Sequence, residues 1–188
     1  MRAIPMGIVT IAVWGFLAPS VYSQRYIRRS QRATVSQSVN TTEISIRYGR
    51  PVARGRQLFG NGGAVYHSPW TPGADASTTV EFSRDVWIDG QPLEAGSYSL
   101  WFTPDTDPWR VIFSSAADVF HLPYPAGTEV LELYLAPMEL EYLEVLTFSF
   151  PVVTVDETVI RFQWGTRALD IPVRVEREKE MRPSRDDW

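Results

Sequence analysis

The sequence predicts an all-β domain: an antiparallel β-sandwich, or a flattened barrel, of about nine short strands with little helix. Three observations lead to this prediction. Apolar residues alternate with polar ones at a period of two along much of the chain, turn signals recur at short intervals, and no segment has the pattern of a helical crossover. An antiparallel sheet with one buried face produces such alternation.

The expected strands follow one another along the chain. The first two, 34–39 and 43–48, flank a hairpin turn at 40–42. Turn signals at Asp89-Gly90 and at 105–108 separate several of the others. The remaining alternations are Val80 to Ile88, Tyr98 to Phe102, Trp109 to Phe113, Leu131 to Leu135, Leu146 to Phe150, Ile160 to Trp164 and Leu169 to Val175.

The first 23 residues have the pattern of a secretory signal peptide. Arg2 supplies the positive start, Met6 to Ala18 is an apolar run, and residues 21–23 resemble a small-x-small cleavage site. We therefore expect export to the periplasm or the cell exterior, with a mature chain that begins at Gln24 and has no membrane span. The alternative is an uncleaved membrane anchor, although the run is shorter than the roughly 20 apolar residues that cross a bilayer.

The mature chain is expected to comprise a basic segment (24–33), a single β-domain (34–176) and a charged, frayed tail (177–188). Residues 24–56 include eight arginines and one acid, whereas the chain beyond them has nine basic and twenty-one acidic residues. The basic segment either packs beside the acidic remainder or contacts an anionic lipid or polysaccharide. A net charge of -4 and the expected export argue against a nucleic-acid partner.

The composition also limits the chemistry. The sequence has no cysteine and only two histidines, His67 and His121. This excludes disulfides, thiol nucleophiles and metal centres built from several histidines or thiolates. We therefore expect no metal and no cofactor.

The long irregular segment Gly55 to Ser77 is the expected location of a functional site. His67 and Asp75 within it are candidate catalytic residues of a hydrolase, although the sequence has no G-x-S-x-G element. Three arginines near its start are candidates for holding either Asp75 or an external anion through bidentate hydrogen bonds. They are Arg50, Arg54 and Arg56.

Tryptophans are the second set of candidate ligand-binding residues. Trp70 lies in the irregular segment, whereas Trp87 and Trp101 lie on expected strands, out of register with their apolar neighbours. If those neighbours face the core, the two rings point outward and form a platform for a glycan or an envelope protein. If both sheet faces are covered, the same rings belong to the core.

Several motifs occur together in a fixed order: RPVARGRQLFG (50–60), WTPGADASTTVEFS (70–83), LEAGSYSLWFTP (93–104), WRVIFS (109–114) and LTFSF (146–150). Over residues 31–175 this series resembles the bacterial exported family known as domain of unknown function 2911. The resemblance implies an exported, mostly β domain without an established activity. Where it implies an arginine and an asparagine, this chain has Thr71 and Asp75.

Together these observations favour a non-catalytic, exported binding or envelope-associated domain. It would use the Gly55 to Ser77 segment and nearby aromatic side chains. An uncharacterised hydrolase with His67 and Asp75 in its site is the alternative.

Overall fold

A computed structural model describes residues 30–60, 68–104 and 107–177, and in these ranges it has ten strands and no helix. The predicted signal peptide, residues 24–29 of the basic segment, His67 and residues 178–188 of the tail lie outside the described residues. The strands are β1 (Gln31–Val39), β2 (Thr42–Arg50), β3 (Thr78–Phe82), β4 (Val86–Ile88), β5 (Gln91–Leu93), β6 (Gly96–Thr103), β7 (Trp109–Ser114), β8 (Glu129–Leu135), β9 (Met138–Ser149) and β10 (Glu157–Val175).

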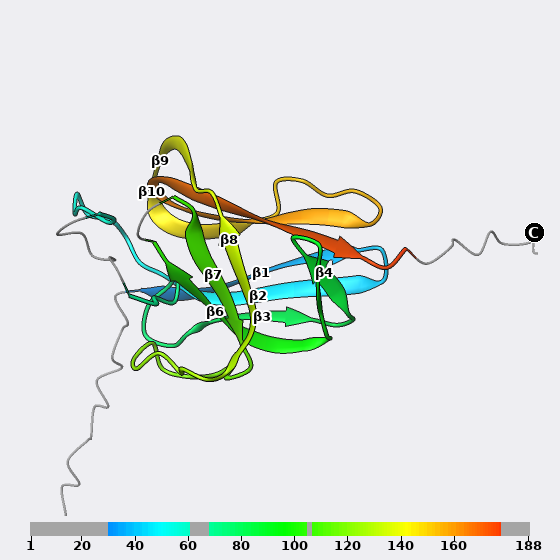
Figure 1. Cartoon of the computed structure of the whole chain (residues 1–188). Helices are drawn as coiled ribbons and strands as arrows, with labels where there is room; N and C mark the ends of the chain where they lie inside the picture. The colour runs from blue at the N-terminus through cyan, green and yellow to red at the C-terminus, as the bar shows by residue number, and fades with distance from the viewer. Residues whose placement is uncertain (1–29, 61–67, 105–106, 178–188) are drawn as a thin grey trace, which may run out of the picture.

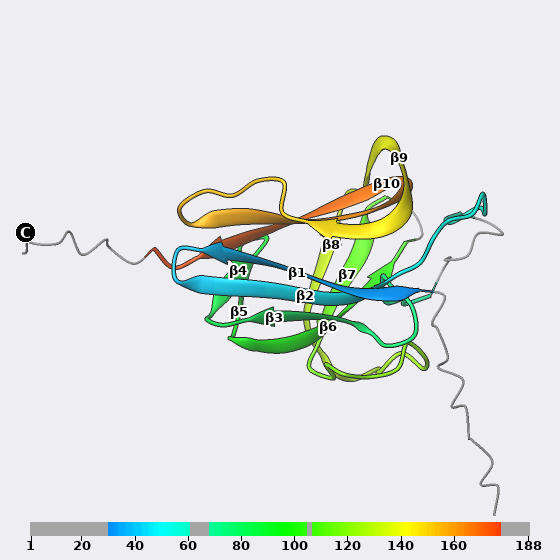
Figure 2. The same ribbon diagram turned by 180° about the vertical axis from the view of Figure 1, so that it is seen from behind.

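The strands form two layers that face each other (Figures 1 and 2). One sheet has six strands in the order β1-β2-β3-β6-β7-β8, and the other has four in the order β5-β4-β10-β9. All strand pairings between different elements are antiparallel. The predicted antiparallel β-sandwich is therefore confirmed, and the two separate sheets decide against a flattened barrel. Within the described ranges, no helix is long and apolar enough to cross a membrane.

Strand β10 doubles back on itself, so it takes the place of two strands expected from the sequence. The N–H of Val175 donates to the carbonyl of Asp156 at 2.8 Å, and Arg161 pairs with Asp170 at 2.6 Å. Contacts between residues so far apart in one strand require a reversal near its middle, where Gly165 has a φ of +62°. The two halves therefore lie side by side in the second sheet.

The single strand expected from Val80 to Ile88 is in fact two strands in different sheets. β3 ends at Phe82 in the six-stranded sheet, and β4 begins at Val86 in the four-stranded sheet. At the crossing, Ser83 N–H donates to the carbonyl of Glu43, and Ser83 Oγ accepts the N–H of Glu43. The period of two continues across the break because both strands turn their apolar side chains toward the same core.

Two predicted turns are confirmed. Val39 pairs with Thr42 across a two-residue turn in which Asn40 has a φ of +51°. Asp89 and Gly90 both have positive φ and connect β4 to β5, which is the geometry of a type I′ hairpin turn.

Aromatic rings fill the space between the sheets. The ring centroid of Phe162 in β10 lies 5.3 Å from that of Phe102 and 6.3 Å from that of Trp109, both in the opposite sheet. Within its own sheet it lies 5.7 Å from Phe148, whose backbone N–H donates to the Tyr48 hydroxyl of β2 at 3.2 Å. Burial of each such ring stabilises the fold by roughly 1.5–3 kcal/mol, so these contacts hold the two layers together.

The reversal of β10 predicts a difference between two glycines with positive φ. A Cβ at Gly165 would lie 2.9 Å from Leu58 Cδ1, whereas a Cβ at Gly90 would have no atom within 4 Å. We expect Gly90→Ala to lower the free energy of unfolding by about 1–2 kcal/mol, the cost of a left-handed residue. Gly165→Ala should cost about 1 kcal/mol more because Leu58 must also shift. Urea denaturation measures both, and equal losses would contradict the close contact.

Candidate functional site

A cavity of about 460 Å³ lies at the end of the sandwich where four connections meet. Arg56 and residues 58–60 line one side. Pro104 and Asp107 come from the β6–β7 connection, Pro137 from the β8–β9 turn, and residues 165–167 from the reversal of β10. In Figure 1 the β8–β9 turn and the reversal of β10 lie at the left of the molecule. We call this space the end cavity.

The segment after β2 is fixed to β9, and this attachment positions residues 56–60. Ala53 N–H donates to the carbonyl of Glu144 at 2.8 Å, and Leu146 N–H donates to the carbonyl of Pro51 at 3.0 Å. Arg50 adds a side-chain contact, since its Nε donates to the Leu146 carbonyl at 3.2 Å. The segment therefore bridges the two sheets before it reaches the cavity.

Aromatic side chains supply the apolar part of the lining. Trp109 and Trp164 are only 4% and 3% exposed, so little of either ring reaches the cavity. Phe59 is half-buried and packs on both, with centroid distances of 5.2 Å to Trp109 and 6.2 Å to Trp164. Tyr142 is 56% exposed. The aromatic surface available to a ligand therefore belongs to Phe59 and Tyr142.

Arg56 is held in place at the cavity. Its Nε donates to the carbonyl of Ala53 at 2.9 Å, and its Nη2 donates to the carbonyl of Val52 at 2.8 Å. The guanidinium carbon lies 5.9 Å from the ring centroid of Trp164, within the range of a cation–π contact. A guanidinium has five N–H groups, so three donors of Arg56 are not used by these bonds.

Two further charged residues complete the described lining. Asp107 is its one acid, and Arg167 is its second cation. Arg167 Nη1 lies 3.6 Å from Glu139 Oε1, and both side chains are largely exposed. Such an exposed pair contributes only about 0–1 kcal/mol, so Arg167 can exchange this partner for a ligand at small cost.

Trp164 has an unusual feature in this lining. Its Nε1 is buried and has no hydrogen-bond partner among the described residues. An unsatisfied buried donor costs roughly 1–3 kcal/mol, and a phenylalanine at this position would avoid that cost. The ring contacts of Trp164 with Trp70 and Phe59 offset this cost.

The contact expected between the three arginines and Asp75 does not occur among the described residues. Arg50 binds β9, and Arg56 binds its own loop. The backbone N–H of Arg54 donates to Glu144 Oε1 at 2.7 Å. Glu144 is thus the carboxylate that this region holds: the Tyr142 hydroxyl and then the Arg54 N–H donate to it and lower its pKa.

Asp75 lies beside His121 and outside the end cavity. Its carbonyl accepts the backbone N–H of His121 at 3.0 Å and lies 2.7 Å from His121 Nδ1. Because a carbonyl can only accept, Nδ1 carries the proton in this contact. The half-buried His121 therefore binds the Asp75 backbone and not its carboxylate. His67 is outside the described residues, so the proposed pairing with Asp75 remains a prediction.

Of the two interpretations left open for Trp101, the exposed ring does not occur. Trp101 is fully buried, its Nε1 donates to Ser99 Oγ at 2.8 Å, and the ring of Tyr124 packs edge-on against it at 5.1 Å. Trp101 does point away from the space between the sheets, but the connection between β7 and β8 covers that outer face. The alternative interpretation, with both faces of this sheet covered, is correct here.

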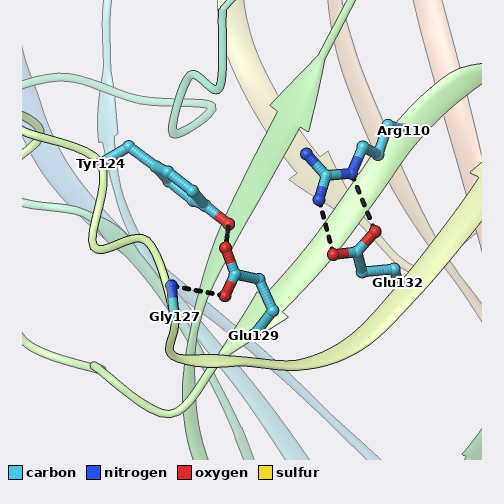
Figure 3. Close-up of polar contacts among 5 residues, drawn as sticks. All are labelled: Arg110, Tyr124, Gly127, Glu129 and Glu132. Carbon is cyan, nitrogen blue, oxygen red and sulfur yellow. Dashed lines mark hydrogen bonds and ion pairs between the residues drawn. The ribbon is translucent and has the colours of Figure 1, made fainter.

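Hydrogen bonds fix this covering segment to β8 (Figure 3). The Tyr124 hydroxyl donates to Glu129 Oε1, and the Gly127 N–H donates to Glu129 Oε2 at 2.7 Å. The Tyr124 bond lowers the pKa of Glu129, whereas burial and then this bond raise the pKa of Tyr124. Nearby, Arg110 and Glu132 form a bidentate pair across β7 and β8. The hydrogen bonds of Glu129 therefore hold the β7–β8 connection over Trp101.

Trp87 and Trp70 lie elsewhere. Trp87 is half-buried in the four-stranded sheet, with the guanidinium of Arg174 4.2 Å from its ring centroid. Because Trp101 belongs to the other sheet, the two rings do not form one platform. Trp70 stacks on Trp164 at 6.0 Å within the core, where an edge contact with Phe162 also holds it.

Of the predicted site residues that the structure describes, only Arg56 lines the end cavity. Sequence reasoning selected the segment that provides Phe59 but missed four lining residues from distant parts of the chain: Asp107, Tyr142, Trp164 and Arg167. One signal was available, since Gly165-Thr166 interrupts the apolar alternation between two expected strands. In the described ranges, no group of three or more histidine or acidic residues is placed to hold a metal ion.

The unpaired N–H of Trp164 generates a prediction about stability, for which a substitution of Trp101 is the control. Trp164→Phe removes a donor without a partner, so we expect it to lower the free energy of unfolding by no more than about 1 kcal/mol. Trp101→Phe breaks a bond to buried Ser99 Oγ and should cost about 2–3 kcal/mol. Chemical denaturation of both variants tests this order, and a larger loss for Trp164→Phe would contradict it.

Comparison with protein-family models matches residues 30–173 to one family, described as a protein family of unknown function, DUF2911. Neither the curated proteins nor the solved structures that were compared contain a match. The matched region runs from the start of β1 into the second half of β10 and includes every described residue of the end cavity. The resemblance found in the sequence is thereby confirmed, and the chain belongs to the DUF2911 family.

Proposed function

We propose that this chain is an exported, non-catalytic binding domain whose ligand enters the end cavity. The observation that supports this most is the combination of a held arginine, Arg56, with the accessible rings of Phe59 and Tyr142 around about 460 Å³ of space. Small-molecule sites combine apolar side chains with polar groups that fix the orientation of the ligand, and this lining supplies both kinds. The volume accommodates a ligand of one or two sugar rings.

The lining favours binding over hydrolysis. Its described residues include no histidine and a single carboxylate, Asp107. Glycoside hydrolysis uses two carboxylates that face each other at about 5–9 Å, and acyl transfer uses a nucleophile beside a base. The hydrolase alternative with His67 and Asp75 has less support, because Asp75 does not line this cavity.

The cavity predicts a ligand response that depends on Phe59. In a thermal-shift screen of glycans, a ligand at about 100 times its Kd should raise Tm by about 5–10 °C. Phe59→Ala should remove most of this shift because it deletes an accessible wall of the cavity. Tyr134→Ala is the matched control, since Tyr134 is a 63% exposed ring outside the lining.

Two results would count against the proposed binding site. One is a shift that Tyr134→Ala reduces as much as Phe59→Ala does. The other is a flat response to every glycan by a protein with a sharp unfolding transition.

Export predicts a processed chain. We expect signal peptidase to cleave after Ser23, so intact-mass analysis of the protein from a bacterial host should show an amino terminus at Gln24 in the periplasmic or medium fraction. Arg placed in the middle of the apolar run, as in Ile11→Arg, should leave the full-length chain in the cytoplasm. Full-length protein in the membrane fraction would instead indicate the uncleaved anchor.

A further inference from the structure

We infer that the ligand of the end cavity is a sugar acid, a pyranose ring that carries one carboxylate. This inference rests on the proposed binding function and names the ligand class of the same site. It is drawn from five residues that line the cavity: Arg56, Phe59, Asp107, Tyr142 and Arg167.

Arg56 provides the carboxylate contact. Its bonds to the Ala53 and Val52 carbonyls use Nε and one N–H of Nη2. Both N–H groups of Nη1 and the second N–H of Nη2 have no hydrogen bond to the described residues, and they form the end of the guanidinium fork. Two parallel N–H donors at this end match the two oxygens of a carboxylate, and the carbonyl bonds keep the fork oriented before a ligand arrives.

Asp107 provides the contact for hydroxyl groups. An ionised carboxylate only accepts hydrogen bonds, so it suits a ligand that is rich in O–H donors. It also repels negative charge, and this disfavours inorganic phosphate or other dianions in the same space. Arg56 and Arg167 are the cations of the described lining and Asp107 is its one acid, while Glu139 and Glu144 lie beside it against Arg167 and Tyr142. The arginines can therefore hold one carboxylate, whereas the surrounding acids disfavour a ligand with more negative charge.

The rings provide the surface for the sugar itself. Phe59 is half-buried, and Tyr142 is 56% exposed with its hydroxyl donated to Glu144 at 2.6 Å. This bond directs the hydroxyl of Tyr142 to Glu144 of the same chain, so the Tyr142 ring presents mainly apolar surface to the cavity. A pyranose has C–H faces that pack on such rings, whereas acetate and phosphate lack them.

The test compares acidic and neutral ligands that differ in one group. Titration calorimetry of the protein would use oligosaccharides of glucuronic or galacturonic acid and the same compounds with each carboxyl reduced to the primary alcohol. We expect the acidic form to bind at least tenfold more tightly than the neutral form. Arg56→Gln should weaken the acidic ligand by roughly tenfold to a hundredfold and remove the preference.

Two variants act as controls. Arg54→Gln removes a positive charge only two residues from Arg56, but the Arg54 side chain lies outside the lining. It should change the affinity for the acidic ligand by less than about threefold because exposed charges are screened. Arg56→Lys retains the charge but loses the fork, so most of the preference should disappear. Arg167→Gln should also lower the affinity for the acidic ligand. If Arg56→Gln fails to fold, this variant and Arg56→Lys test the inference in its place.

The outcomes separate the two proposals. Equal affinity for the acidic and neutral sugars, with binding still lost in Phe59→Ala, overturns the sugar-acid inference and leaves the binding function standing. Tighter binding of inorganic phosphate or acetate than of the sugar acid also overturns the inference. Absence of binding by every sugar overturns both proposals.

Discussion

Ring packing around Phe162 is the interaction on which the rest of this structure depends. Phe162 contacts rings from both sheets and from the segment that includes Trp70. The chain has no disulfide and no helix in its described ranges, so apolar contact between the sheets must supply most of the stability. The large aromatic side chains achieve this with few residues because each buries a wide surface.

The same packing explains why the end cavity exists. Trp109 and Trp164 extend the ring cluster to the end of the sandwich, and Phe59 closes over them from the segment after β2. That segment is bound to β9 by backbone hydrogen bonds, and Arg56 is held against the same segment by the carbonyls of Ala53 and Val52. A rigid core thus supports a polar rim, and a ligand would meet side chains that are already ordered.

The outer faces of the sheets differ. A connection fixed by Tyr124 and Glu129 covers the outer face of the six-stranded sheet around Trp101 and buries this ring. On the four-stranded sheet, Trp87 has Arg174 against its ring and borders clefts of about 560 and 250 Å³. The larger cleft is lined by Asp85, Glu94 and Glu176, and its acidic character sets it apart from the end cavity, which has two arginines.

The sequence by itself determined the fold class, the positions of most strands and the two hairpin turns, because alternation and turn chemistry are local properties. It also selected the segment Gly55 to Ser77, whose start supplies Arg56 and Phe59 to the end cavity. Only the tertiary structure decided that Val80 and Ile88 belong to different sheets, that β10 reverses at Gly165, and that Trp101 is covered. Each of these three features depends on contacts between segments that are distant in the sequence. The end cavity, which brings Arg56, Tyr142 and Trp164 together, depends on such contacts as well. An alternation with a period of two shows which side chains lie on the same face of a strand, but it does not show what packs against that face.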